Sequence, residues 1–382
     1  MRNDITVTFF SNFLLHHQTP FCEVMVKLIG NNFHFVATTP IPQERIDMGY
    51  HDYRNEPYAV NSYMDEKSYA YAMELGEKSD VVIIGSAPDI FVEERLKQDK
   101  LTFRYYERFF KQGKWRILDP RVLFSLYKMH IRYRKKNLFM LCASAYTALD
   151  CRFIFSYPNK TFKWGYFIQV KEQSFEELLQ KKNDKQIKIL WVSRFIKLKH
   201  PEEVIKLAQK LSADGIDFCI EMIGIGELRE KYETIVEHLG LNEKVIFKGP
   251  MSPEEVIDEM ETADIFLFTS DRQEGWGAVL NEAMTSGCAV VACNEIGSVP
   301  YLIEDGVNGF VYNKKEKDSL YQKVRQLIDN KELRRNIQFE AYQTMHNVWN
   351  AEVAAERLIN LIDGIKEGKE AGYKKGPCSR DK

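Results

Sequence analysis

Short apolar runs alternate along most of the chain with longer segments whose apolar residues recur at helical spacing. The clearest are Ile265–Phe268, which is wholly apolar, and Ile187–Val192 and Phe218–Ile223, which each contain one charged residue. An apolar run without two-residue alternation is typical of a strand buried on both faces, as in parallel sheets. Strands that alternate with helices predict a doubly wound parallel α/β sheet. The first half contains further runs of this kind, at 5–10, 33–38, 81–85 and 138–143.

The chain of 382 residues is longer than one hydrophobic core usually serves, so the sequence predicts two domains. A charged stretch with little apolar face is the expected linker. The last amphipathic pattern predicts a C-terminal helix, and the charged, glycine-containing residues after it predict a disordered tail. The predicted parts are a first domain at 1–170, the linker at 171–185, a second domain at 186–346, the final helix at 347–365 and the tail at 366–382.

Seven cysteines are scattered through the chain, and no two of them form a Cys-x-x-Cys pair. An odd, scattered set predicts reduced thiols and argues against both a disulfide framework and a zinc site. The start of the chain lacks the long apolar segment of a signal peptide, and no apolar stretch has the length of a bilayer-spanning helix. We therefore expect a cytoplasmic protein.

A basic and aromatic segment lies at 103–136. From position 104 on it has eleven Lys or Arg residues against only Glu107 and Asp119, interleaved with aromatic residues. Part of it has apolar residues at helical spacing, and such a segment can lie on an anionic membrane surface. A solvated amphipathic helix of the first domain is the alternative. Nucleic-acid binding is disfavoured, because the whole chain has a net charge of −2.

The stretch from 263 to 309 combines a buried strand, a polar loop and a helix. Two glycines frame Trp276 in the loop, and the helical pattern that follows ends at Gly287. Glu274 thus falls in the loop and Glu282 inside the helix. The free N–H groups and the positive dipole end of a helix that follows a strand favour a bound phosphate. Because carboxylates would repel a phosphate, the two glutamates must serve another part of a ligand.

This stretch, with the run Gly275-Trp276-Gly277 between the two glutamates, resembles the Glu-x7-Glu signature of retaining glycosyltransferases of family 4, the glycosyl transferases group 1. The resemblance implies the GT-B fold, in which two Rossmann-like domains with doubly wound parallel sheets face a cleft. It also implies a donor site where Glu274 contacts hydroxyls of the sugar and Glu282 the ribose. The alternative, from the residues alone, is a solvated loop followed by a solvated helix face.

The predicted strand Ile187–Val192 is followed by SRFIKLKH, which resembles the strand-Arg-x4-Lys element of the same family. The resemblance places Arg194 and Lys199 at the diphosphate of the donor. Two cations held there would stabilise the negative charge that the departing nucleotide gains, without a metal ion. The alternative is a pair of ordinary surface cations. His200 stands where the family usually has glycine, which leaves the local backbone conformation open.

Two further loops of the second domain are expected to bind the donor. Gly224 and Gly226 follow a predicted strand, although a lone Gly-x-Gly is by itself a weak sign of a nucleotide site. By resemblance, a later loop with Lys248, Pro250 and Met251 would contact the nucleotide base. These loops would complete the donor site around the glutamates and the basic pair.

The first domain resembles the family mainly in architecture. Many members have a glycine-rich loop after the first strand that approaches the donor diphosphate, but this chain has SNFLLHHQ there. His16, His17 and Gln18 correspond to a His-Gln pair of other members and would then face the cleft between the domains as hydrogen-bonding groups. A solvated loop is the alternative.

The resemblances imply a transferase that moves a hexosyl or N-acetylhexosaminyl group from a UDP- or GDP-linked sugar to a hydroxyl, with retained configuration. The chain lacks the Asp-x-Asp triplet with which the other large glycosyltransferase fold holds a metal, so no metal and no further cofactor are expected. The expected acceptor is a glycan or lipid-linked glycan of a bacterial-type surface polysaccharide or glycolipid, at the inner face of a membrane. A nucleotide-sugar epimerase or hydrolase, and a non-catalytic nucleotide-binding protein, are the alternatives.

Overall fold

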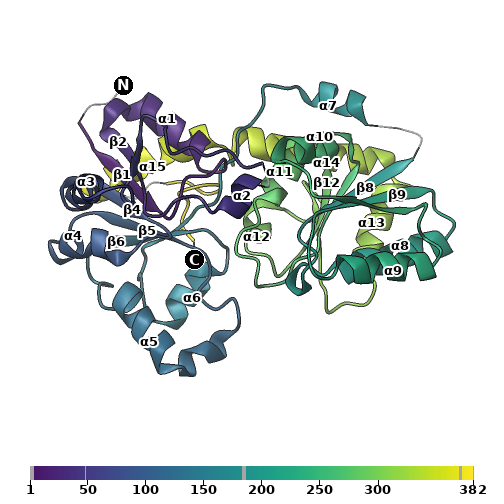
Figure 1. The fold of residues 1–382 in the computed structure, drawn as a ribbon, viewed down its shortest axis with the longest axis horizontal. Coiled ribbons are helices and arrows are strands. Elements are labelled where there is room, and N and C mark those ends of the chain that lie inside the picture. The colour runs from purple at the N-terminus through teal and green to yellow at the C-terminus, as the bar shows by residue number, and fades with distance from the viewer. Residues whose placement is uncertain (1–3, 48, 183–185, 370–371, 382) are drawn as a thin grey trace. The chain divides into compact units, whose positions relative to one another are not determined.

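The computed structural model describes residues 4–47, 49–182, 186–369 and 372–381. The described residues form two compact units, each a sheet covered by helices (Figure 1). The N-terminal unit comprises 1–169 together with 349–382, and the C-terminal unit comprises 170–348. The chain therefore leaves the first unit, forms the second and returns. None of the described helices is both long and apolar enough to cross a bilayer.

The sheet of the N-terminal unit has seven strands in the order β3-β2-β1-β4-β5-β6-β7. Every neighbouring pair is parallel; for example, Phe9 of β1 lies opposite Phe35 of β2 and Ile83 of β4. The parallel sheet confirms the predicted fold class for this unit. Its strands are β1 (Val7–Ser11), β2 (Phe33–Ala37), β3 (Ala59–Asn61), β4 (Val81–Ile84), β5 (Thr102–Tyr106), β6 (Leu138–Cys142) and β7 (Thr161–Lys163).

The α-helices of this unit are α1 (Thr19–Ile29), α2 (Gln43–Asp47), α3 (Glu66–Lys78), α4 (Glu93–Lys97), α5 (Pro120–Leu126), α6 (Thr147–Phe153) and α15 (Ala351–Lys366). They cover both faces of the sheet, because alternate side chains of a strand point to opposite sides. Phe9 contacts the ring of Phe21 in α1, whereas Phe10 contacts Phe91 and the core formed with α3. α15 packs against α1, so the end of the chain completes the first of these two layers.

The sheet of the C-terminal unit has six strands in the order β10-β9-β8-β11-β12-β13, and all of its pairs are parallel. Its strands are β8 (Ile187–Val192), β9 (Phe218–Ile223), β10 (Val245–Gly249), β11 (Ile265–Phe268), β12 (Ala289–Cys293) and β13 (Phe310–Tyr312). Its α-helices are α7 (Phe175–Lys181), α8 (Pro201–Ala213), α9 (Arg229–His238), α10 (Pro253–Thr262), α11 (Val279–Thr285), α12 (Val299–Leu302), α13 (Ser319–Asp329) and α14 (Lys331–Asn347). α8 packs with α9 and α13, and α11 packs with α10 and α14.

In each sheet the chain runs from a central strand outward to one edge and then resumes on the other side of that strand. In the C-terminal sheet β8 to β10 run one way and β11 to β13 the other, and in the N-terminal sheet the direction changes between β3 and β4. The loops that follow two neighbouring strands diverge at such a switch point, and α/β proteins bind ligands there, outside the carboxyl ends of the strands. The topology thus marks one place for a ligand in each unit.

The predicted linker, 171–185, differs from the structure. Its described part groups with the C-terminal unit and contains α7, while 183–185 lie outside the described residues. A capping box starts this helix, and Phe175 and Leu178 are buried. Two apolar residues one turn apart are enough to dock a short helix, even in a segment whose composition is mostly charged.

The predicted disordered tail, 366–382, was wrong for residues 372–381; residues 370, 371 and 382 lie outside the described part. Lys163 in β7 donates its N–H to the carbonyl of Ser379 at 2.8 Å, and its own carbonyl accepts the N–H of Cys378 at 2.8 Å. Both tail residues are buried. β7 is an edge strand with backbone groups to satisfy, and the tail pairs with them. Backbone pairing requires no apolar pattern, so composition does not reveal it.

Candidate active site

The predicted catalytic residues lie at the switch point of the C-terminal sheet. Arg194 follows β8, and Lys199 ends a short 3-10 turn before α8. Glu274 lies in the loop after β11, and Glu282 lies in α11. Because β8 and β11 are neighbours and parallel, both loops leave the same edge of the sheet. The fold therefore brings together segments that are about 75 residues apart in sequence.

Lys199 and Glu274 form a direct ion pair, with only 13% and 15% of their side chains exposed. The loops that carry them are also joined through their backbones. The hydroxyl of Thr269 donates to the carbonyl of Lys199 at 2.6 Å, and the N–H of Asp271 donates to the carbonyl of Leu198 at 3.0 Å. The solvated-loop alternative is thus wrong for Glu274. Each charged group is the other's counter-ion, so an anion that binds Lys199 would release Glu274.

His200 adopts the left-handed conformation, with φ 50° and ψ 54°, that glycine would supply at this position. Its imidazole joins the two loops: Nδ1 lies 2.6 Å from a carboxylate oxygen of Glu202, and Nε2 lies 3.1 Å from one of Asp271. The bond to Glu202 raises the pKa of His200 in spite of its partial burial. Although burial alone would raise the pKa of Glu202, the bond to His200 lowers that pKa to about 2. The substitution thus keeps the backbone conformation and adds a polar contact.

The run Gly275-Trp276-Gly277 shapes the turn before α11. Trp276 is fully buried, its indole N–H donates to Asn281 at 2.8 Å, and its carbonyl accepts the hydroxyl of Ser298 at 2.6 Å. Gly277 has φ 78°, and a Cβ there would lie 2.3 Å from the ring of Phe268. The indole therefore supports the loop from inside, and only the backbone of this run is left to contact a donor.

The two predicted glycines, in the loop after β9, allow this loop to pack closely against the backbone on either side of Arg194. A Cβ on Gly224 would lie 2.0 Å from the carbonyl oxygen of Ser193, and one on Gly226 would lie 2.5 Å from that of Phe195. In addition, the N–H of Phe195 donates to a carbonyl of the β9 loop at 2.7 Å. Both glycines are needed for this backbone contact, which fixes the residues on either side of Arg194.

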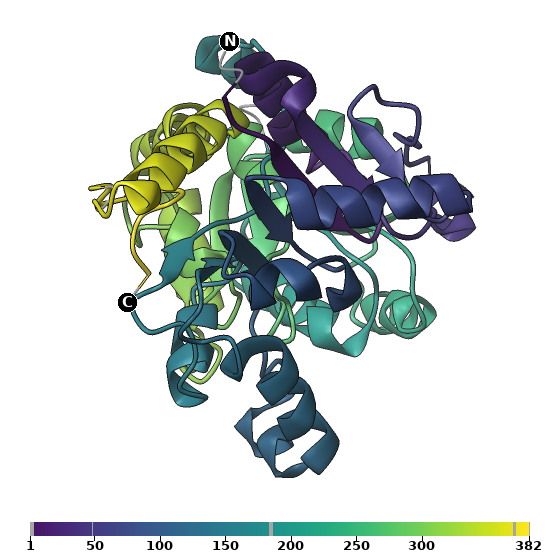
Figure 2. The same ribbon diagram turned by 90° about the vertical axis from the view of Figure 1, so that its left-hand side faces the viewer.

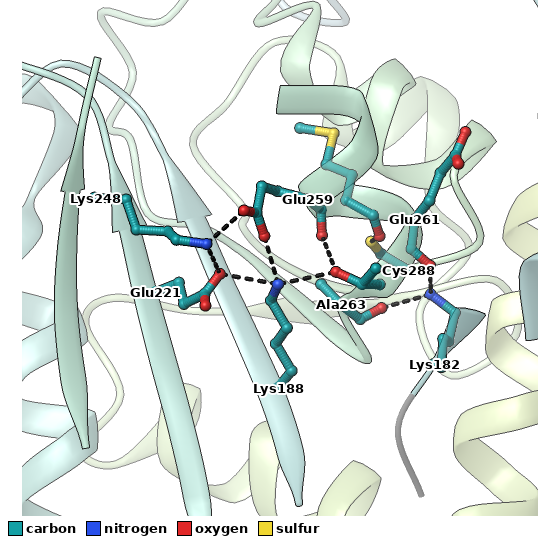
Figure 3. A network of polar contacts seen from close by, with 10 residues as sticks. Lys182, Lys188, Glu221, Lys248, Glu259, Glu261, Ala263 and Cys288 are labelled. Atoms are coloured by element: carbon teal, nitrogen blue, oxygen red, sulfur yellow. Dashed lines mark hydrogen bonds and ion pairs between the residues drawn. The ribbon is translucent and has the colours of Figure 1, made fainter. Parts of the chain in front are cut away.

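Lys248 was predicted to contact the nucleotide base, but its ammonium group is engaged elsewhere. It contacts Glu259 and lies 3.3 Å from Glu221, and Lys188 shares the same two carboxylates (Figure 3). Although burial alone would raise the pKa of Glu259, its bonds to the two lysines lower that pKa to about 2. This cluster joins β8, β9 and β10 to α10, so we assign the side chain of Lys248 to the structure of the unit. Of the other residues predicted there, Pro250 is exposed and Met251 half-buried.

In the N-terminal unit the loop after β1 is not a solvated loop. The ring of His17 stacks on Tyr166 at a centroid distance of 4.5 Å and also contacts the ring of His16. Burial, with smaller contributions from nearby cations, lowers the pKa of His17 to about 3, so its imidazole is neutral. Gln18 is buried, and its side-chain oxygen accepts the N–H of Leu15 at 3.2 Å. Gln18 therefore holds the loop, and His17 and His16 are placed by aromatic contacts.

Sequence reasoning missed two sets of polar residues at these edges. In the C-terminal unit it missed Thr269 and Asp271, which join the loops of Lys199 and Glu274. In the N-terminal unit it missed Tyr166, whose hydroxyl donates to Glu107 at 3.0 Å. None of these residues belongs to a recognisable spacing. Thr269 and Asp271 follow a predicted strand, whereas Tyr166 has no such signal.

Comparison with known proteins places the C-terminal unit in a family. Residues 172–344 match the family model of the glycosyl transferases group 1. Among curated relatives, an uncharacterized glycosyltransferase of Methanocaldococcus jannaschii is 34% identical over 32% of this chain and 34% of its own. An N-acetyl-alpha-D-glucosaminyl L-malate synthase of Bacillus anthracis is 24% identical over 56% of each chain. A D-inositol 3-phosphate glycosyltransferase of Corynebacterium diphtheriae is 29% identical over 45% of this chain and 41% of its own. The matches thus span about a third to a half of these relatives.

Solved structures extend the likeness to both units. A crystal structure of Anabaena HepE in complex with UDP has a TM-score of 0.69 at 13% identity and covers 94% of this chain and 100% of its own. A crystal structure of WaaG, a glycosyltransferase involved in lipopolysaccharide biosynthesis, has a TM-score of 0.61 at 17% identity, with coverage of 94% and 100%. Two all-parallel sheets of this topology define a GT-B fold protein. The part of the chain that matches the glycosyl transferases group 1 family is its C-terminal unit.

Proposed function

We propose that the protein is a retaining glycosyltransferase that moves a hexosyl or N-acetylhexosaminyl group from a nucleotide sugar to a hydroxyl of an acceptor, without a metal ion. One observation carries the proposal. Lys199 and Glu274 meet at the switch point of the unit that matches the family, where the fold predicts a ligand site. The likeness to HepE, whose crystal structures contain UDP and UDP-glucose, supports a UDP-linked donor.

In this proposal the donor diphosphate binds Arg194 and Lys199. Arg194 is exposed in a loop whose backbone is fixed by Gly224 and Gly226, so its guanidinium is available to a ligand. As the bond from sugar to diphosphate breaks, the leaving group gains negative charge, and the two cations stabilise it. Cations placed in this way do the work that a divalent metal does in other transferases, which is why we propose metal-independent transfer.

The ion pair adds a step that the family resemblance alone does not contain. The diphosphate takes the ammonium group of Lys199 as its counter-ion, and Glu274 thereby loses its internal partner. The released carboxylate then accepts hydrogen bonds from hydroxyls of the sugar and stabilises positive charge at the reacting carbon. Glu282 lies in the first turn of α11 and serves the ribose of the nucleotide. Donor binding and the placement of the catalytic carboxylate are thus one event.

Direct assay with a set of nucleotide sugars tests this function. Binding is found first by thermal stabilisation, since a ligand of the native state raises the melting temperature with its occupancy. The product of the selected donor is then examined by NMR, where a retained anomeric configuration is expected, and activity should persist in excess EDTA. Inversion, or complete loss of activity in EDTA that a metal restores, would overturn the mechanism. Donor turnover that never reaches an acceptor would indicate a hydrolase or epimerase, and tight binding without turnover a non-catalytic protein.

We also propose that the N-terminal unit contacts an anionic membrane through 103–136, as suits a glycan or lipid-linked acceptor. The 3-10 turn Lys114–Leu118 and α5 project from the sheet of this unit (Figure 2). Leu118 is 80% and Phe124 68% exposed. Exposed apolar side chains among cations suit a surface with an apolar interior and anionic headgroups. The exposed apolar side chains of this region are Trp115, Leu118, Leu123, Phe124 and Tyr127.

A further inference from the structure

A pocket of about 530 Å³ opens at the carboxyl ends of β4, β5 and β7, within the N-terminal unit. It takes its lining from the ends of three strands and from the loop that follows β5. A second pocket of about 480 Å³ shares Tyr106, Phe109, Arg116 and Val122 with it and extends along the inner side of α5. The two pockets therefore adjoin each other, and the first lies at the carboxyl edge of the parallel sheet. The lining residues on which the inference depends are Tyr105, Glu107, Arg108, Lys111, Arg116 and Tyr166.

The charges of the first pocket are unbalanced. Its lining has three cations, Arg108, Lys111 and Arg116, and one carboxylate, Glu107. That carboxylate is already engaged, because one oxygen pairs with Lys111 and the other accepts the hydroxyl of Tyr166. Within the described part of the chain, neither arginine has a salt bridge with a carboxylate. Asp150 attracts Arg108 and Asp119 attracts Arg116, in each case without a direct ion pair. A bound anion can therefore still pair with both guanidinium groups.

Arg108 is held in place before any ligand binds. Its guanidinium lies over the ring of Tyr146 at 4.7 Å, and its Nε is buried without a hydrogen-bond partner. The backbone just after it is fixed by buried Asp150, which accepts the N–H groups of Phe109 and Phe110 at 2.9 and 3.2 Å. A buried donor that lacks a partner costs free energy. The protein bears this cost while Arg108 lines the pocket, which suggests that its guanidinium is kept there to bind a ligand.

We propose that this pocket binds the acceptor through an anionic group, a phosphate or a carboxylate, which Arg108 and Arg116 recognise. The inference rests on the proposed function and adds the chemical class of the acceptor. Arginine suits this role because its planar fork of donors matches the oxygens of both anions. The rings of Tyr105 and Tyr166 provide flat surfaces for a sugar or cyclitol beside that anion. The second pocket, with Phe109, Val122 and Met129, accepts an apolar substituent.

Arginine variants test the proposal by direct binding, which requires no turnover. Glucose 6-phosphate, inorganic phosphate and uncharged glucose are titrated into the whole protein and followed by NMR. We expect the two phosphates to bind better than glucose, and Arg108→Met and Arg116→Met each to weaken phosphate binding by about tenfold, the size of one charge-assisted hydrogen bond. Arg152→Met is the matched control, since Arg152 is exposed in α6, lies outside 103–136 and lines neither pocket. Equal binding of glucose and its phosphate, or equal effects of all three variants, would overturn the proposal.

Two further measurements separate the possible outcomes. Melting temperatures show whether each variant is folded. If Arg108→Met unfolds the unit because the contact with Tyr146 is lost, Arg116→Met still tests the pocket. Vesicles of phosphatidylglycerol and of phosphatidylcholine then identify the source of the anion. If Arg108→Met weakens binding to phosphatidylglycerol alone, the anion is a lipid headgroup; if it weakens glucose 6-phosphate binding, a soluble anion is accepted. No effect on either would contradict the pocket.

Failure of this inference is distinguishable from failure of the proposed function. UDP binding, and the release of UDP from a nucleotide sugar in the absence of an acceptor, depend on Arg194, Lys199 and Glu274 in the C-terminal unit, and should not change in Arg108→Met. Phosphate binding that responds to the arginines without any turnover of donor would support the pocket and contradict the transferase. Turnover of the donor, together with phosphate binding that is unchanged in both arginine variants, would support the transferase and contradict the pocket.

Discussion

The two units have the same architecture but arrange charge in opposite ways. In the C-terminal unit the cation and the carboxylate at the switch point, Lys199 and Glu274, neutralise each other. In the N-terminal unit Arg108 and Arg116 line a pocket whose single carboxylate is engaged by other residues. In a paired site, a ligand can replace one member of the ion pair as the counter-ion of the other. In an unbalanced site, a ligand of opposite charge binds without breaking an ion pair. The fold thus supplies the same edge twice, and the side chains decide what each edge recognises.

The same contrast appears in the similarity to other proteins. The family model covers 172–344, which lies in the C-terminal unit, whereas the likeness over the N-terminal unit is one of fold. The proposed donor site, if it is common to the family, accounts for the common sequence there. A pocket that differs from protein to protein in what it accepts leaves the fold as the only shared feature.

The largest expected effect is loss of the carboxylate in the paired site. Glu274→Gln should lower kcat by about 10² or more, the cost of removing one preorganised polar group at a reacting centre. It should not weaken UDP binding, because it removes the group that competes with the diphosphate for Lys199. Steady-state kinetics and calorimetry with UDP measure the two effects. Glu254→Gln, at an exposed position in the first turn of α10, is the matched control.

Glu282→Gln sharpens this test because it should show the reverse pattern. Its loss removes a contact to the ribose that exists before and during reaction, so UDP affinity should fall by about tenfold while kcat changes little. Equal loss of UDP affinity in both variants would show that the sugar and the ribose have not been assigned to the correct carboxylates.

The cation of the pair should have the next largest effect. Lys199→Met should lower kcat by roughly ten- to a hundredfold, more than it raises KM, because the charge it meets grows as the bond breaks. It also leaves a largely buried Glu274 without its counter-ion, so the melting temperature should fall. Lys197→Met, in the same 3-10 turn but exposed, should change neither quantity. If both variants behave alike, the ion pair has no special role.

The N-terminal unit is tested by its interaction with membranes, where a several-fold effect is expected. Sedimentation with phosphatidylglycerol vesicles should weaken as salt rises, because exposed charges are screened over about 8 Å at physiological ionic strength. Removal of the four clustered cations Arg132, Arg134, Lys135 and Lys136 should weaken it further, and Phe124→Ser should weaken it by loss of an exposed ring. Equal sedimentation with neutral vesicles would leave the segment without this role.

The smallest effect concerns His200 and the dependence of stability on pH. Its pKa is raised in the folded protein by its bonds to Glu202 and Asp271, so the protonated form stabilises the fold. That stabilisation is complete below the ordinary pKa of histidine, near 6.5, and is lost as pH rises through the raised value. The melting temperature of His200→Asn, which tolerates the left-handed backbone, should therefore fall furthest below that of the unaltered protein at low pH. A difference in melting temperature that stays constant with pH would contradict the assignment.

Local pattern was sufficient for much of the fold. The runs Ile187–Val192, Phe218–Ile223 and Ile265–Phe268 are strands with the predicted bounds. Ile265–Phe268 is apolar because it is buried along its whole length, whereas the other two each contain one charged residue that joins the ion-pair cluster. The family resemblance is also local, because it rests on two short spacings. Glu274 and Glu282 form the Glu-x7-Glu pattern, and Arg194 and Lys199 form the Arg-x4-Lys pattern. The sequence by itself thus determined the fold class, the family resemblance of the second half, and the two charged residues, Lys199 and Glu274, that the structure brings together.

Tertiary structure alone decided which polar groups meet. Lys199 and Glu274 become an ion pair only because β8 and β11 are neighbours, and Lys248 turns out to be engaged by Glu221 and Glu259. The ordered tail beside β7 and the cavity around Arg108 likewise depend on contacts between distant segments. The physical reason is that each residue's own polarity indicates whether it is buried. The partner of a charge or a backbone group instead depends on which strands are neighbours in the sheet.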